Sequence, residues 1–226
     1  MTLEARKIRL VMELRRQGVT DKAVLSAIER VPRELFVPAT FHDQAYENTA
    51  LPIGHGQTIS QPAVVAYMTQ ALDLGPRMKV LEVGTGCGYQ AAVLARLCRR
   101  VYTVERHREL RREAEARFAE LRIRNITSRW GDGTKGWNEQ APFDRIIVTA
   151  GAPQVPDTLF EQVAPDGVLI APVGRNAQEQ ALVRYRRTAE GWQSETLWPV
   201  RFVPLVEGAA DSGVNGGGQG VSQATR

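Results

Sequence analysis

The sequence predicts an α/β fold with one doubly wound, mostly parallel sheet, preceded by helices and followed by an antiparallel strand pair. Two observations support this prediction. Short apolar segments alternate with amphipathic ones in the order β-α-β-α-β and then β-α-β, a pattern typical of a parallel sheet with helices on both faces. A glycine-rich turn from Gly84 to Gly88 joins the first of these strands to its helix, and ligands of such folds bind beyond the carboxyl ends of the strands.

Two helices are expected before the sheet. Apolar residues recur at helical spacing from Leu3 to Gln17, and Gly18 ends this segment. Thr20 or Asp21 then caps a second helix, which closes near Pro32.

The segment from Phe36 to Ile59 has no clear periodicity and contains several prolines and glycines. A loop of this length inside a domain is usually functional. Ser60 follows it, and Pro62 opens an apolar helix that runs through Leu72. A serine just before a helix with proline in its first turn is typical of an N-cap, so helix capping is the simplest structural role for Ser60.

The sheet itself comes next. Expected strands are 79–83, 101–105, 126–130, 143–150 and 168–173, separated by helices at 90–98, 109–121 and 155–163. Residues 181–187 and 192–205 predict the final antiparallel pair, with a turn at Gly191.

One domain is expected over residues 1–207. Within it, residues 1–60 supply helices and a substrate loop, and residues 61–207 form a cofactor-binding core. Residues 208–226 are rich in glycine and poor in apolar residues, which predicts a flexible tail.

The spacing of the glycine turn favours one cofactor over another. The turn reads G-x-G-x-G through Gly84, Gly86 and Gly88, whereas dinucleotide-binding folds use G-x-G-x-x-G around a pyrophosphate. This difference favours S-adenosylmethionine, which has no phosphate. A tight βα turn that binds no ligand is the alternative.

Two acids follow the next two strands. Glu105 lies 21 residues after Gly84, where doubly wound folds place a carboxylate that accepts hydrogen bonds from ribose hydroxyls. Asp132 lies between two glycines after the third strand and is placed to accept a hydrogen bond from an adenine amino group. Each acid alone is more often a solvated loop residue or a helix cap. Three successive strand ends with suitable groups favour a cofactor site.

Composition limits the location and the partners. No apolar run among the 226 residues approaches the ~20 needed to span a bilayer, and the charged N-terminus is unlike a signal peptide. The two cysteines and three scattered histidines match neither a disulfide framework nor a metal site. We therefore expect a cytoplasmic protein with no metal and no membrane partner.

Arginine is abundant between Arg96 and Arg129, where eleven arginines stand against five acids. A nucleic-acid surface would explain this excess. The acids, however, are interleaved at spacings that pair charges along a solvated helix, and no aromatic stacking platform accompanies them. We expect no nucleic-acid partner.

Several motifs together carry a resemblance to a known family. The most specific is Gln57-Thr58-Ile59-Ser60-Gln61-Pro62, and the others are residues 36–38, 45–48, 51–56, 81–89, 131–133, 146–150 and 200–205. In these motifs the chain resembles the protein-L-isoaspartate O-methyltransferases, of the bacterial type, from about Leu3 to Glu207. Cys87 stands where members often carry serine, and Val206 where some carry threonine.

The resemblance implies a Rossmann-like methyltransferase fold and a repair activity. The expected reaction moves a methyl group from S-adenosyl-L-methionine to the free α-carboxylate of L-isoaspartyl residues in damaged proteins and peptides, leaving S-adenosyl-L-homocysteine. The methyl ester then closes to a succinimide, which hydrolyses partly to L-aspartyl. We expect a monomer whose partners are these isoaspartyl substrates.

The resemblance also assigns residues. Ser60 is the expected catalytic residue, with Thr58 and Ile59 beside it at the junction of cofactor and substrate. The expected cofactor-binding residues are Gly84, Thr85, Gly86, Gly88, Glu105, Arg106, Asp132 and Gly133. Substrate backbone is expected to meet the Tyr46–Gly56 loop and the Val203–Val206 strand.

The chemistry asks little of the protein. The acceptor carboxylate, with an ordinary pKa of about 3.5, is ionised at neutral pH and needs no general base. Orientation remains, and the Ser60 hydroxyl can donate a hydrogen bond to one carboxylate oxygen and aim the other at the methyl group.

Other functions stay open as alternatives. A methyltransferase for RNA or small molecules would share the glycine turn, Glu105 and Asp132. The chain lacks the Asn/Asp-Pro-Pro-Tyr/Phe segment of base amino methylation and the Pro-Cys nucleophile of C5 methylation. A nicotinamide-dependent oxidoreductase would need the G-x-G-x-x-G spacing, which this glycine turn lacks. An arginine-rich nucleic-acid binder would leave the Ser60 motif unexplained.

Overall fold

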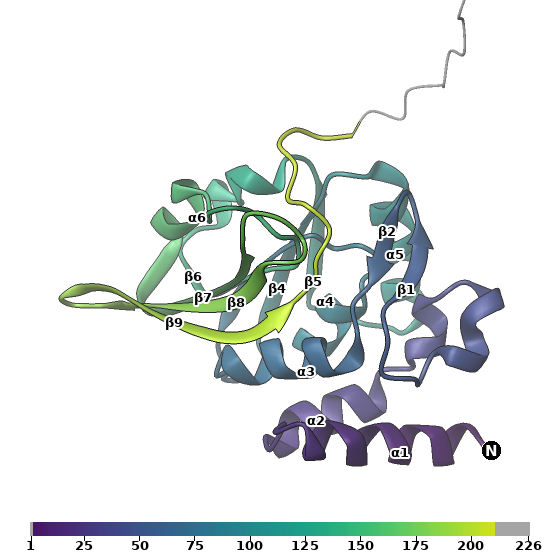
Figure 1. Ribbon diagram of the computed structural model, residues 1–226. Coiled ribbons are helices and arrows are strands. Elements are labelled where there is room, and N and C mark those ends of the chain that lie inside the picture. The colour runs from purple at the N-terminus through teal and green to yellow at the C-terminus, as the bar shows by residue number, and fades with distance from the viewer. Residues whose placement is uncertain (1, 211–226) are drawn as a thin grey trace, which may run out of the picture.

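The computed structural model describes residues 2–210, which build a seven-stranded sheet with helices packed on it and a separate two-stranded hairpin (Figure 1). The order in the large sheet is β5-β4-β3-β6-β7-β8-β9. Its strands are β3 (Lys79–Val83), β4 (Arg100–Glu105), β5 (Ile126–Trp130), β6 (Phe143–Val148), β7 (Val163–Val173), β8 (Gln180–Thr188) and β9 (Gly191–Val200). The first five pair in parallel, and β8 and β9 pair antiparallel. The predicted fold class is confirmed.

The helices lie close to where the sequence predicts them. They are α1 (Leu3–Arg16), α2 (Lys22–Arg30), α3 (Pro62–Ala71), α4 (Tyr89–Leu94), α5 (Arg108–Glu120) and α6 (Asp157–Glu161). Asp21, rather than Thr20, caps α2, since its carboxylate accepts hydrogen bonds from the N–H groups of Ala23 and Val24. Helix α4 is shorter than expected and ends at Leu94 instead of Cys98.

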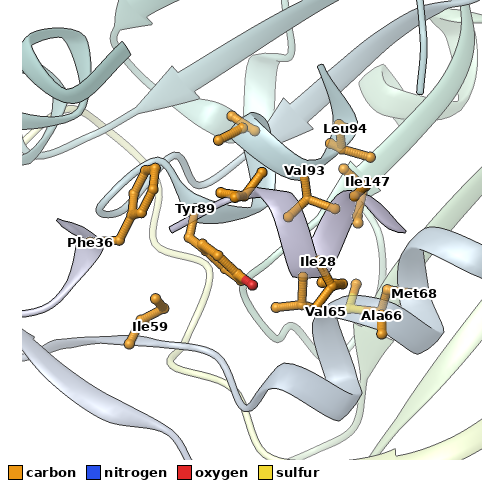
Figure 2. Packing of buried hydrophobic residues seen from close by; sticks show 14 of the residues in the cluster. Ile28, Phe36, Ile59, Val65, Ala66, Met68, Tyr89, Val93, Leu94 and Ile147 are labelled. Atoms are coloured by element: carbon orange, nitrogen blue, oxygen red, sulfur yellow. The ribbon is translucent and has the colours of Figure 1, made fainter. Parts of the chain in front are cut away.

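Alternation along the strands creates a hydrophobic cluster on each face of the sheet. In β3, Val80 belongs to the cluster beneath the helices α1 to α5, and Leu81 and Val83 belong to the cluster beneath α6. Figure 2 shows part of the larger cluster, in which the ring of Tyr89 lies near Phe36. The centroids of these two rings are 5.4 Å apart. The sheet is therefore covered on both faces, as parallel sheets require.

The segment expected to be a long loop has more structure than its sequence suggests. After short 3₁₀ turns, η1 (Arg33–Phe36) and η2 (Ala39–Gln44), the chain forms the hairpin of β1 (Leu51–Gly54) and β2 (Gln57–Ile59). Two short strands with proline and glycine give too little periodicity to be recognised. The hairpin leads directly to Ser60.

The last described residues return to the sheet. Strand β9 ends at Val200, so the strand predicted to reach Leu205 is too long. Beyond it, Gly151 forms a parallel bridge with Pro204: the N–H of Gly151 donates to the carbonyl of Val203, and the N–H of Leu205 donates to the carbonyl of Gly151. The N–H of Ala210 donates to the carbonyl of Arg106. The glycine-rich tail predicted from residue 208 lies mostly outside the described residues.

No helix within residues 2–210 is both long enough and apolar enough to cross a membrane.

Candidate active site

A cleft opens at the carboxyl ends of β3, β4 and β6, where parallel αβ sheets bind ligands. Its volume is about 790 Å³ when the open mouth is included. The predicted residues that line it are Thr58, Ile59, Ser60, Gly84, Thr85, Gly86, Glu105, Arg106 and Gly133. The structure thus brings nine of the predicted site residues to one cavity.

Two glycines that line the cleft, Gly84 and Gly133, have no room for a side chain of their own. Gly84 has φ +100°, and a Cβ there would lie 2.4 Å from the Thr149 hydroxyl oxygen. At Gly133 a Cβ would lie 2.6 Å from Cγ1 of Val83. Neither position accepts a larger residue without displacement of its neighbour. The two glycines therefore allow the loops at the strand ends to pack closely beside the cleft.

Glu105 is held in place by backbone groups on both sides. Its Oε2 accepts a hydrogen bond from the N–H of Gly86 (2.8 Å), and its Oε1 accepts one from the N–H of His107 (2.9 Å). The side chain is buried but lines the cleft. Because a carboxylate has about four acceptor positions, two remain for the hydroxyls of a ribose.

Asp132 lies next to the cleft but does not line it. Its Oδ1 accepts hydrogen bonds from the N–H and the hydroxyl of Thr134 (2.9 and 2.7 Å). Burial raises the pKa of this carboxyl, but the hydrogen bonds from Thr134 and from the backbone of Gly208 outweigh burial and hold the pKa below its ordinary value. The carboxylate caps η3 (Gly133–Lys135). Asp132 therefore has the role of a helix cap, which was the alternative interpretation of this acid.

Gly88 is also absent from the cleft wall. It has φ +92°, precedes α4, and a Cβ there would lie 2.7 Å from a ring carbon of Phe118 in α5. The third glycine of the motif therefore allows α4 and α5 to pack closely, which is a structural role.

Arg106 and the hairpin contact other segments close to Glu105. The Nε of Arg106 donates to the carbonyl of Gly208 (3.3 Å). His55, at the turn of the hairpin, lies against His107, with ring centroids 5.4 Å apart. The N-terminal hairpin and the last described residues thus both reach this end of the site.

A second, more open groove adjoins the cleft. It is lined by residues of the N-terminal segment, including Asn48 to Ala50, and by Pro199 to Val203 from the end of β9. Four residues line both hollows: Thr58, Ser60, Thr149 and Val203. An acceptor in the groove and a donor in the cleft would meet at these four residues.

Ser60 lies at this junction, but it is not the helix cap that its sequence position predicts. The N-cap of α3 is Gln61, which makes no side-chain capping bond. Oδ1 of Asn48 instead accepts the hydrogen bond from the N–H of Ala63 (2.9 Å). Asn48 is distant in sequence, so the local pattern could not reveal it. Its contact leaves the Ser60 hydroxyl without a hydrogen bond in the described part of the chain.

Thr149 is a site residue that the sequence analysis did not single out. Its hydroxyl is 2.9 Å from the carbonyl of Val83 and 2.7 Å from that of Gly84, and it donates toward them. It follows β6, so the rule that led to Glu105 and Asp132 applies equally to it. A threonine at a strand end is a weaker sequence signal for a binding site than an acidic residue is.

Within residues 2–210, no three histidine, cysteine, aspartate or glutamate side chains are grouped as a metal site would require.

Comparison with known proteins identifies the family. A family model described as Protein-L-isoaspartate(D-aspartate) O-methyltransferase (PCMT) matches residues 5–210. The chain belongs to this family. It is 63% identical to the protein-L-isoaspartate O-methyltransferase of Rhodospirillum centenum over 93% of this chain and 96% of that protein. With the Paramagnetospirillum magneticum enzyme of the same name the identity is 64%, over 91% and 96% of the two chains.

Solved structures of O-methyltransferases in this family share the fold. One protein-L-isoaspartate O-methyltransferase has a TM-score of 0.80 at 30% identity, over 88% of this chain and 65% of that chain. A Plasmodium falciparum structure, described as a putative member in complex with S-adenosyl-L-homocysteine, has a TM-score of 0.74 at 25% identity, over 88% and 97%. The resemblance read from the motifs is confirmed.

Proposed function

We propose that the chain transfers a methyl group from S-adenosyl-L-methionine to the free α-carboxylate of L-isoaspartyl residues in proteins and peptides, and that the Ser60 hydroxyl orients that carboxylate. One observation carries the proposal for Ser60. Its side chain lines both the cleft and the groove, and its hydroxyl has no hydrogen bond to another described residue. It is therefore available to an acceptor at the place where the two hollows meet.

The reaction fits what this site contains. The bound cofactor supplies an electrophilic methyl group. The acceptor carboxylate is ionised at neutral pH, so no residue has to remove a proton. A hydrogen bond from Ser60 to one oxygen directs the other oxygen toward the cleft, and alignment of this kind lowers the barrier by several kcal/mol. The bond must stay moderate, because the carboxylate loses charge as the ester forms.

The cofactor roles divide along the cleft. We assign the methionine part to Gly84, Thr85 and Gly86, and the ribose hydroxyls to Glu105. The adenine is assigned to Gly133, with Arg106 at its edge. Asp132 and Gly88 remain proposed cofactor-binding residues, placed next to the cleft and not on its wall.

The acceptor is assigned to the groove. Thr58 and Val203 line it together with Ser60, and Ile59 lines the adjoining cleft. We assign the backbone of the substrate to residues 46–56 and 203–206, since recognition through the backbone suits substrates whose sequence varies around the damaged residue. We propose that residues 1–207 act as one domain and as a monomer. Both cysteines are unpaired and buried, which is consistent with the cytoplasm.

The test is methyl transfer from labelled S-adenosylmethionine to two peptides that differ only in L-isoaspartyl against L-aspartyl. We expect base-labile label on the isoaspartyl peptide alone. Ser60→Ala should lower the rate by roughly 10- to 100-fold, since orientation is lost, while the affinity for S-adenosylhomocysteine stays within about twofold. Ser194→Ala, at an exposed position of β9, is the matched control and should behave as wild type. Equal label on both peptides, or full activity of Ser60→Ala, would contradict the proposal.

A further inference from the structure

Arg33 is an unusual residue for its surroundings, because it is fully buried directly behind the proposed acceptor site. The side chain is 0% exposed. Its Nη2 donates a hydrogen bond to the carbonyl of Ser60 (3.0 Å) and a longer one to the carbonyl of Thr49 (3.4 Å). These two carbonyls flank the β1–β2 hairpin. One guanidinium thus ties together the two chain segments that enter and leave it.

The same guanidinium also contacts the cofactor side of the site. Its Cζ lies 4.8 Å from the ring centroid of Tyr89, the first residue of α4 and part of the cleft wall. Figure 2 shows this ring among the buried side chains, with Ile59 on the hairpin nearby. Arg33 therefore connects the hairpin, Ser60 and the helix that follows the glycine turn.

The charge of Arg33 is not neutralised by an acid. In the described part of the chain it takes part in no salt bridge, and its Nε and Nη1 have no hydrogen-bond partner. Burial lowers its pKa, but a guanidinium remains charged in proteins. A buried charge without a counter-ion destabilises the fold. Placement next to an anion-binding site would account for its presence.

We propose that Arg33 is a positioning residue for the acceptor: it fixes the backbone of Ser60 and Thr49, and its positive charge favours the α-carboxylate of the substrate at Ser60. The inference rests on the proposed function. Arg33 is then the residue that makes the site prefer a charged acceptor group. Arg33 lies on the buried side of Ser60 and does not contact the acceptor. Its charge therefore attracts the carboxylate, but it forms no hydrogen bond with the carboxylate oxygen that reacts.

The charge and the hydrogen bonds of Arg33 can be separated with two variants. Arg33→Gln removes the charge and leaves a shorter amide donor, and Arg33→Lys keeps the charge and removes the planar fork. The probes are the isoaspartyl peptide and the same peptide with its α-carboxylate replaced by a carboxamide. Their affinities are measured by calorimetry on the full chain saturated with S-adenosylhomocysteine.

We expect Arg33→Gln to weaken binding of the carboxylate peptide by roughly 10-fold, because a partly screened unit charge is lost, and to leave binding of the carboxamide peptide within about twofold. Arg33→Lys should retain the preference for the carboxylate. Arg145→Gln is the matched control: Arg145 is also buried and donates to backbone carbonyls, those of Leu72 and Asp73, at the opposite end of the sheet. It should leave both affinities unchanged.

If Arg33→Gln weakened the binding of both peptides equally, the proposal would be overturned, because this result would show a displaced loop and no role for the charge. Loss of the carboxylate preference in Arg33→Lys would also overturn it, and this outcome decides the matter if Arg33→Gln does not fold. Melting temperature and affinity for S-adenosylhomocysteine establish folding in each case. Failure of the proposed function is distinct: the wild-type protein would then not methylate the isoaspartyl peptide at all.

Discussion

Replacing Glu82 by glutamine should remove a large part of the pH dependence of this protein's stability. Glu82 lies in the middle of β3 and is 0% exposed. Oε2 accepts a hydrogen bond from the hydroxyl of Thr103 (2.5 Å), and Oε1 has no partner within the described residues. Burial raises the pKa of this carboxyl to about 8, and the hydrogen bond from Thr103 only partly offsets the rise. The folded protein thus holds a proton that the unfolded chain releases.

The size of the effect follows from proton linkage. Below the unfolded pKa of about 4.5 both states are protonated, and the stability is fully present. As the pH rises toward the folded value of about 8, the free energy of unfolding falls by about 1.4 kcal/mol per pH unit. Between pH 6 and pH 8 this amounts to about 2 kcal/mol, because the slope flattens near the folded pKa. Glutamine keeps the acceptor for Thr103 and has no proton to lose.

The assay is urea unfolding of wild type and Glu82→Gln at pH 6, 7 and 8, followed by circular dichroism. We expect the variant to gain about 2 kcal/mol relative to wild type over this range. Glu190→Gln, an exposed position in the turn between β8 and β9, is the matched control and should show no such trend. A difference between Glu82→Gln and wild type that stays constant with pH would refute the reasoning, since Glu82 would then be ionised in the fold.

Two further substitutions test the packing that supports the site. Asn48→Ala removes the cap of α3 at Ala63 and should lower the free energy of unfolding by about 1 kcal/mol in urea titration; an unchanged stability would show that water replaces the cap. Gly88→Ala adds a methyl group 2.7 Å from Phe118 at φ +92° and should cost about 3 kcal/mol. Gly18→Ala, also at positive φ but with nothing within 4 Å, should cost only about 1 kcal/mol, and equal losses at the two glycines would contradict the packing argument.

The sheet and the cofactor cleft could be predicted because their signals are local. A buried strand, a glycine turn and an acid at the next strand end follow one another within 27 residues, from Lys79 to Glu105. Parallel pairing then brings the strand ends to one edge. The same rule placed Asp132 only approximately, because its carboxylate is satisfied by Thr134, two residues along the chain.

The acceptor side was harder to predict because its contacts are not local. Hydrogen bonding of Asn48 to Ala63 spans 15 residues, and that of Arg33 to Ser60 spans 27. No periodicity records such pairs. Ser60 precedes a helix with proline in its first turn and so meets the local criteria for a cap. Asn48, from the preceding segment, has that role instead. The motif resemblance singled out Ser60 as the expected catalytic residue, but only the structure shows that Asn48 takes the capping role and that the Ser60 hydroxyl has no hydrogen bond within the described residues.

These two observations suggest a division of labour within the N-terminal segment. Because Asn48 caps α3, the Ser60 hydroxyl is not needed to accept a hydrogen bond from the helix. Arg33 fixes the carbonyl of the same residue from the buried side. A serine that is held at its backbone, and free at its side chain, can hold a carboxylate in one orientation with little loss of entropy on binding. Asn48→Ala should consequently affect the acceptor as well as the fold. If α3 then recruits Ser60 as its cap, the acceptor KM will rise while the affinity for S-adenosylhomocysteine stays constant; an unchanged KM would show that Ser60 keeps its position without Asn48.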